Sequence, residues 1–334
     1  MRTPAESGRQ EDPPRQSSPV NRLVRAVLGL FAAPRINMLE DYEKVRKFQR
    51  QLAAPLIPPA RATDHEVLST YGDHHIPVRV FHPKEQLRDE VLLFFHGGGW
   101  VIGDVETYTP TCIRMADLTG CVVIAVDYRL APEHPFPAGL HDCYQVAQQL
   151  LDDPRPAGIE DSSNIVLIGD SAGGNLAAVV SLLLKERGHR PPAKQILFYP
   201  VTQWDHDPET SPYDSVREHG EDYRLTNTEV QDYFDLYTPD LDRRRDWHVA
   251  PLMAEDLTDQ PDTLVITAEL DLLRDEGEAY GHALRDAGNT VHIHRVEGAL
   301  HGFIALPRIS RSVRETYEVI TAFLDDETSP EASA

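Results

Sequence analysis

The sequence predicts an α/β fold in which a mostly parallel sheet is covered by helices on both faces. Between residues 91 and 296, short apolar runs rich in β-branched residues alternate with stretches of helical periodicity. Within this series, Ile165–Lys185 joins an apolar strand to an amphipathic helix through the tight turn Gly169-Asp170-Ser171-Ala172-Gly173. Such alternation builds a parallel sheet, and 334 residues suffice for one large domain with an appendage.

The individual elements follow from local periodicity and turn residues. We expect two paired strands at Glu66–Tyr71 and Ile76–His82, around the turn Gly72-Asp73. The further strands are predicted at Val91–Phe95, Val122–Val126, residues 165–169, residues 195–199, Thr263–Thr267 and His292–Val296. Helices are predicted at Tyr108–Thr119, Leu140–Leu151 and Asn175–Lys185, and a further helix, with Asp275 inside its first turn, runs to about Ala287.

Two segments depart from the alternation. Val20–Ala54 predicts two helices, which end at prolines 55, 58 and 59. Val201–Leu257 is long for a stretch without a strand, and Thr226 and Glu229 fit a capping box at the start of a helix within it. We expect both segments together to form a lid over Ser171.

These observations divide the chain into six parts. We expect a disordered tail at 1–19, N-terminal cap helices at 20–58, the main α/β domain at 59–200 and 251–327, an inserted cap segment at 201–250, and a second disordered tail at 328–334.

Composition excludes several classes of partner. The net charge of −22 argues against nucleic acid and anionic membranes. No signal peptide is visible, and the apolar stretch Leu23–Ala33 is too short to span a bilayer, so we expect no stable membrane insertion and a cytoplasmic location.

Three scattered cysteines predict reduced thiols rather than disulfides or a zinc site. A monomer and a homodimer both remain open.

Ser171 occupies the centre of a G-x-S-x-G turn between a buried strand and a helix. At such a turn the serine is held in a strained conformation with its hydroxyl above the sheet. The unpaired N–H groups of the helix N-terminus favour negative charge at this point. Many sequences of this kind are ordinary glycine-rich turns, but this context predicts a nucleophile.

A nucleophilic serine needs a base and a group that orients the base. His301 follows the strand at 292–296, and Asp271 follows the preceding strand at 263–267. Because both strands end at the same edge of the sheet as the Ser171 turn, we expect the three side chains to meet. Asp271 could instead be a helix N-cap, and Glu269 and Asp275 stay open as alternative acids.

His96-Gly97-Gly98-Gly99-Trp100 directly follows the strand Val91–Phe95. Consecutive glycines allow backbone N–H groups to approach an oxyanion, which predicts an anion site. No dinucleotide- or phosphate-binding glycine motif is present, so a nucleotide-binding role lacks support. His292 and His294 share a strand face without a third ligand, and we therefore predict no metal site.

Five motifs in order resemble the hormone-sensitive-lipase-like family of α/β-hydrolases, the bacterial family IV esterases. They are His96–Trp100, Asp127–Ala138 (DYRLAPEHPFPA), Gly169–Asn175 (GDSAGGN), Arg274–Gly277 and His301–Phe303, within a match over residues 64–325. The family usually has proline after its catalytic aspartate, where this chain has Leu272.

The resemblance implies an α/β-hydrolase fold with an eight-stranded sheet, a helical cap and no cofactor. It implies that Ser171 is the nucleophile, Asp271 the acid and His301 the base, in the chain order that α/β-hydrolases use. The amides of Gly98, Gly99 and Ala172 match the family's oxyanion hole, and Asp127-Tyr128-Arg129 matches a segment interpreted as structural support.

The predicted function is a serine carboxylesterase that cleaves short- to medium-chain esters of small molecules through an acyl-enzyme. An acyltransferase or amidase would use the same triad, and the sequence does not separate these activities. A small-molecule receptor with this fold is a further alternative, but a receptor of that kind lacks the histidine that His301 supplies here.

Overall fold

The computed structural model of the protein describes residues 37–53, 61–155, 164–221 and 223–326. Its centre is one sheet with the strand order β1-β2-β4-β3-β5-β6-β7-β8. The strands are β1 (Ala62–Leu68), β2 (His75–Phe81), β3 (Val91–Phe95), β4 (Val122–Val126), β5 (Ile165–Asp170), β6 (Lys194–Phe198), β7 (Asp262–Leu270) and β8 (Val291–Leu300). β2 pairs antiparallel with β1 and with β4, and all other neighbours are parallel. The predicted mostly parallel sheet is confirmed.

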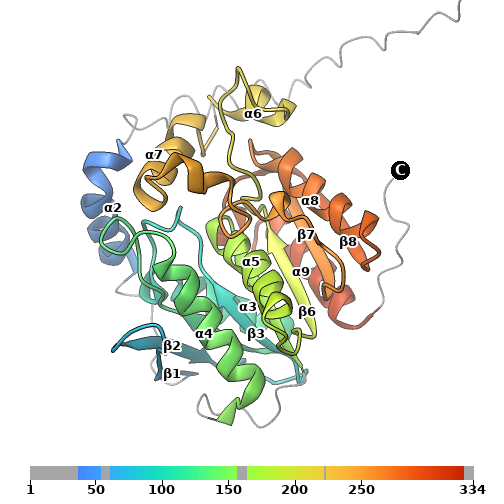
Figure 1. Cartoon of the computed structure of the whole chain (residues 1–334). Coiled ribbons are helices and arrows are strands. Elements are labelled where there is room, and N and C mark those ends of the chain that lie inside the picture. Colours follow the sequence, from blue (N-terminus) through green and yellow to red (C-terminus); the bar gives the residue numbers. More distant parts are fainter. Residues whose placement is uncertain (1–36, 54–60, 156–163, 222, 327–334) are drawn as a thin grey trace, which may run out of the picture. The chain divides into compact units, whose positions relative to one another are not determined.

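Helices cover both faces of this sheet, as the continuous apolar runs of its central strands require. The helices are α2 (Met38–Ala53), α3 (Val105–Thr119), α4 (Ala138–Asp152), α5 (Ala172–Glu186), α6 (Asp214–His219), α7 (Asn227–Tyr237), α8 (Arg274–Asp286) and α9 (Arg311–Leu324). Alternate residues of β3 enter two cores: Leu93 and Phe95 pack with α4, α5 and α8, whereas Leu92 and Phe94 pack with α3 and α9. α4 and α5 lie on the face turned to the viewer (Figure 1).

Strand register brings the predicted site segments together at the carboxyl edge of the sheet. Phe95, the last residue of β3, pairs with Gly169 of β5, so the glycine loop after β3 lies beside the Ser171 turn. Leu270 of β7 pairs with Leu300 of β8. Asp271 directly follows Leu270, and His301 directly follows Leu300. Asp271 and His301 therefore leave the sheet at neighbouring points.

The hairpin at the sheet edge differs from its prediction. β1 begins at Ala62 and ends at Leu68, so residues 69–71 lie outside the strand expected at 66–71. The hydroxyl of Thr70 donates to Gln145 of α4, and the Tyr71 ring stacks on His141 of the same helix. Contacts with α4 thus replace strand pairing for these residues.

α2 and α7 pack against each other, although they are far apart in the sequence (Figure 1). The Met38 N–H of α2 donates to an Asp232 carboxylate oxygen of α7 at 3.2 Å. The predicted capping box is confirmed, because Thr226 and Glu229 each accept from the other's backbone N–H. The second helix expected within Val20–Ala54 is α2, while the first lies outside the described residues, as do both predicted tails. Within the described ranges, no helix is long and apolar enough to cross a bilayer.

Candidate active site

Ser171 is held in a sharp turn between β5 and α5. Its φ is 56°, a conformation that non-glycine residues rarely adopt, and α5 begins at the next residue. A methyl group on Gly169 would overlap the Gly173 carbonyl, and one on Gly173 would overlap the Phe95 carbonyl. Both positions therefore require glycine for lack of space.

His301 lies between Ser171 and Asp271. Its Nε2 is 2.9 Å from the Ser171 Oγ, and its Nδ1 is 2.7 Å from the Asp271 Oδ2. The Asp271 side chain is inaccessible to solvent, and that of His301 is 12% exposed. A buried carboxylate on Nδ1 leaves Nε2 as the nitrogen available to a proton of the serine.

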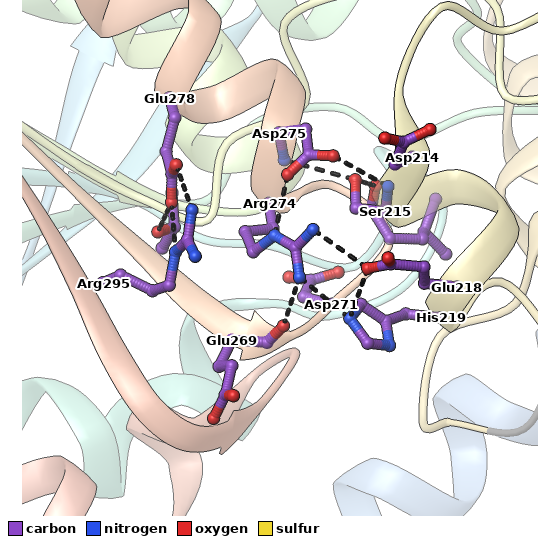
Figure 2. Close-up of polar contacts among 12 residues, drawn as sticks. Asp214, Ser215, Glu218, His219, Glu269, Asp271, Arg274, Asp275, Glu278 and Arg295 are labelled. Carbon is purple, nitrogen blue, oxygen red and sulfur yellow. Dashed lines mark hydrogen bonds and ion pairs between the residues drawn. The ribbon is translucent and has the colours of Figure 1, made fainter. Parts of the chain in front are cut away.

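The three carboxylates that the sequence leaves open as partners of the histidine occupy different environments (Figure 2). Only Asp271 reaches His301; its second oxygen accepts from the Leu273 N–H at 3.1 Å, and α8 begins only at Arg274. Asp275 pairs with Arg274 at 2.7 Å and accepts from the Ser215 N–H at 2.8 Å. Glu269 accepts from the Gly298 N–H at 2.7 Å.

The glycine loop after β3 offers unused backbone donors beside Ser171. Gly98 and Gly99 have φ values of 108° and 60°, and no oxygen of the described residues accepts from their N–H groups. The Ala172 N–H is at the first position of α5, where an amide has no intrahelical partner. The Tyr233 ring of α7 lies against Gly99, where a methyl group would overlap it.

Asp170 connects the serine turn to the glycine loop, a role that the sequence analysis missed. One carboxylate oxygen accepts from the Gly97 N–H at 2.8 Å, and the other accepts from the Tyr108 hydroxyl at 3.1 Å. Burial raises the pKa of Asp170 to about 6, although the Gly97 hydrogen bond opposes this shift. The acid in the G-x-S-x-G sequence gives no sign of this contact by itself, because its partner is the glycine loop after β3, which is distant in the sequence.

The Asp127-Tyr128-Arg129 segment supports the same loop, as predicted. The Tyr128 hydroxyl donates to the His96 carbonyl at 2.7 Å, and the two rings stack with centroids 4.3 Å apart. Arg129 forms a bidentate pair with the buried Asp142. Burial lowers the pKa of His96, which favours a neutral ring that acts in packing.

Tyr199 is a further residue that sequence reasoning missed. It was expected to end a strand at 195–199, but β6 ends at Phe198 and Tyr199 has a φ of 32°. Its ring is buried and lies 4.8 Å from the His301 ring, centroid to centroid. The side chain therefore packs beside the imidazole.

The histidines considered as metal ligands have other neighbours. His294 lies 3.1 Å from a Glu315 oxygen, and the His292 ring packs against Phe323. No group of three or more histidine, cysteine or acidic side chains is arranged to hold a metal ion in the part of the chain that the structure describes.

Residues 92–305 match a family model described as the alpha/beta hydrolase fold. The chain is 32% identical over 284 residues to an arylesterase of Saccharolobus solfataricus, covering 82% of this chain and 88% of the relative. It is 34% identical over 281 residues to the esterase LipI of Mycobacterium tuberculosis, covering 82% and 85%.

Solved structures that resemble this chain are also ester-cleaving enzymes. A hyperthermophilic esterase from the archaeon Pyrobaculum calidifontis superposes with a TM-score of 0.81 at 34% identity, covering 92% of this chain and 98% of that one. An ester hydrolase from the Lake Arreo metagenome, complexed with a derivative of bipyridine phosphonate, has a TM-score of 0.81 at 30% identity, covering 93% and 99%.

Proposed function

Because the chain belongs to the hormone-sensitive-lipase-like family of α/β-hydrolases and is a carboxylic ester hydrolase, we propose that it cleaves esters through a triad of Ser171, His301 and Asp271. The observation that carries this proposal is the chain of two hydrogen bonds, 2.9 Å and 2.7 Å long, that joins the three side chains. Serine, imidazole and carboxylate in this order form a nucleophile, its base and the group that orients the base.

In the proposed reaction, His301 Nε2 takes the Ser171 proton as Oγ bonds to the ester carbonyl carbon. The carbonyl electron pair moves to its oxygen, and Asp271 stabilises the imidazolium that forms. The intermediate collapses when the bond to the alcohol oxygen breaks, and the alcohol leaves with the proton from His301. Water then cleaves the acyl-enzyme by the same sequence of steps and releases the carboxylic acid.

We assign oxyanion binding to the backbone amides of Gly98, Gly99 and Ala172. The unused N–H groups of the two glycines support this role, as does the position of Ala172 at the start of α5. Donors that are already fixed by the loop need no reorganisation when negative charge develops on the carbonyl oxygen. The Gly97 and Tyr108 contacts of Asp170 hold this loop in place.

We propose that α2 and the segment at 201–250 form a cap over a main domain at 59–200 and 251–327. Their contacts with the glycine loop support this division: Arg46 of α2 donates to the Val101 carbonyl at 2.7 Å, and Tyr233 of α7 lies against Gly99. Such a cap limits the space above Ser171, which favours short to medium acyl chains.

Covalent labelling tests the triad. A fluorophosphonate should add a single label to the wild-type protein and none to Ser171→Ala, as measured by intact mass spectrometry. The same proteins, assayed on nitrophenyl esters from acetate to palmitate and on matched anilides, should show that activity requires Ser171 and prefers short esters. Equal labelling of both proteins, with equal activity, would overturn the proposal.

A further inference from the structure

Arg224 lies on the segment that joins α6 to α7, and its neighbours hold it at the candidate active site. Tyr223 is buried and packs its ring edge-on against His219, with centroids 5.0 Å apart. Leu225 packs against the main hydrophobic core, and Thr226 is the N-cap of α7. The backbone is thus anchored on both sides of Arg224, whose own side chain is exposed.

The Arg224 guanidinium rests against Gly302, the residue that follows His301. A methyl group on Gly302 would lie 3.4 Å from Cζ, 3.5 Å from Nη1 and 3.7 Å from Nη2. Because the central carbon is the nearest of the three atoms, the guanidinium presents its flat face to the glycine. Its N–H groups point outward in the plane of the group, in the geometry that binds a carboxylate through two hydrogen bonds.

The charge of Arg224 reaches the groups around Ser171. Burial raises the pKa of Asp170, which precedes the serine, and the positive charge of Arg224 partly opposes this rise. Burial likewise raises the pKa of Tyr108 and Tyr199, and the same charge partly opposes these rises. These groups come from β5, α3 and the segment after β6, so the charge of Arg224 acts on groups of three different elements around the candidate site.

The donors of Arg224 are unused within the part of the chain that the structure describes. In the described ranges, no carboxylate or carbonyl oxygen accepts from it, whereas nearby Arg274 binds Asp275, Glu218 and the Glu269 carbonyl. The chain carries 54 acidic against 32 basic side chains, so a cation that lies next to Gly302 without a partner among the described residues is not a consequence of composition. In such an acidic protein it supplies local attraction for an anion.

We propose that Arg224 binds a carboxylate carried by the ester substrate, so that the protein prefers esters with a negative charge near the cleaved bond. The inference rests on the proposed role of Ser171 and extends it to a class of substrate: half-esters of dicarboxylic acids, or esters whose alcohol bears a carboxylate. Both sources present the same group to the guanidinium.

Two pairs of substrates distinguish a carboxylate on the acyl side of the ester from one on the alcohol side. On the acyl side, mono(para-nitrophenyl) succinate is compared with para-nitrophenyl pentanoate, its uncharged analogue. On the alcohol side, para-acetoxybenzoate is compared with its methyl ester. For each pair, the ratio of kcat/KM for the charged to the neutral ester is measured in wild type, Arg224→Gln, Arg224→Lys and the control Arg190→Gln, which removes an exposed positive charge before the start of β6.

We expect Arg224→Gln to lower this ratio about tenfold for one pair, which identifies the side of the ester that carries the charge. Arg224→Lys should lower it less, because lysine keeps the charge without the paired donors. Arg190→Gln should leave both ratios unchanged. Equal ratios in wild type and Arg224→Gln, with the neutral esters still cleaved, would overturn the inference alone. Failure of wild type to cleave any ester would overturn the proposed function and this inference with it.

Discussion

The Ser215 hydroxyl donates a 2.7 Å hydrogen bond to the carbonyl oxygen of Leu272, the residue that follows Asp271. The Ser215 N–H also donates to Asp275 at 2.8 Å, and the Asp275 N–H donates back to the Ser215 hydroxyl at 3.2 Å. One buried serine of α6 therefore binds both the loop that carries Asp271 and the first turn of α8, where Figure 2 shows its contacts with Asp275. This contact links the inserted segment to the acid of the proposed triad.

We predict that Ser215→Ala lowers kcat about tenfold with little change in KM. Without the bond to Leu272, the loop that carries Asp271 becomes more mobile. Small displacements of groups that orient the reacting atoms lower the rate of the chemical step. Steady-state kinetics on a short nitrophenyl ester measure both constants. Ser211→Ala is a matched control, because Ser211 is buried on the same segment and, among the described residues, its hydroxyl has a single, long contact of 3.5 Å with the Tyr213 N–H. Equal kinetic effects of the two variants would contradict the positioning role of Ser215.

The sequence predicts the central elements well, because they are determined by local signals. Short continuous apolar runs such as Val91–Phe95 are typical of a strand buried on both faces, and β3 has the predicted bounds. In the sequence, Ser171, Asp271 and His301 follow three predicted strands, and the parallel pairing from β5 to β8 brings the ends of these strands to one edge of the sheet. α9 was left unassigned, although Val313, Tyr317, Ile320 and Leu324 give it a clear helical period.

Long-range contacts determine what the sequence analysis missed. Nothing near Asp170 in the chain indicates that its partners are Gly97 and Tyr108, which are more than 60 residues away. Nothing next to Arg224 in the sequence distinguishes it from any exposed arginine, because its neighbour Gly302 lies 78 residues further along the chain. Thr70 and Tyr71 continue the alternating pattern of a strand, but their contacts with α4 end the pairing earlier.

Exchange of acid for amide separates the roles of Asp271 and Asp275. We predict that Asp271→Asn loses on the order of 10² or more in kcat, because an amide neither holds the same histidine tautomer nor stabilises the imidazolium. Asp275→Asn should stay within about tenfold, since Asp275 pairs with Arg274 and Ser215 and does not contact His301. Both variants are compared by kcat on one ester after circular dichroism has shown native folding. A larger loss at Asp275 would assign the acid to that residue.

Arg46 attaches α2 to the glycine loop, and its loss should lower stability. Its guanidinium donates to the carbonyl oxygens of Val101 and Ala131, both at 2.7 Å, and to Glu133 at 2.8 Å. Because hydrogen bonds from a charged donor contribute more than neutral ones, we expect Arg46→Ala to lower the free energy of unfolding by about 2 kcal/mol. Lys47→Ala, on the exposed side of the same helix, should change it by less than about 0.5 kcal/mol. Urea titration measures both, and equal values would show that Arg46 does not anchor α2.

The buried carboxyl of Asp170 should make stability depend on pH. Burial raises its pKa from 3.8 to about 6, so between these values the folded protein keeps a proton that the unfolded chain has lost. The contribution of the protonated Asp170 carboxyl to the free energy of unfolding is therefore fully present below about pH 4. This contribution is lost as the pH rises through about 6. The difference in pKa corresponds to at most about 3 kcal/mol.

Asp170→Asn removes this titration and keeps the shape of the side chain, because the amide oxygen still accepts from the Gly97 N–H. We predict that the free energy of unfolding falls less steeply between pH 4 and pH 7 in Asp170→Asn than in wild type, in urea titrations at fixed ionic strength. The comparison isolates Asp170, since the other titrating groups are common to both proteins. Parallel pH profiles would mean that the Asp170 carboxyl ionises in the folded protein as it does in the unfolded chain, so that the Gly97 and Tyr108 hydrogen bonds fully offset its burial.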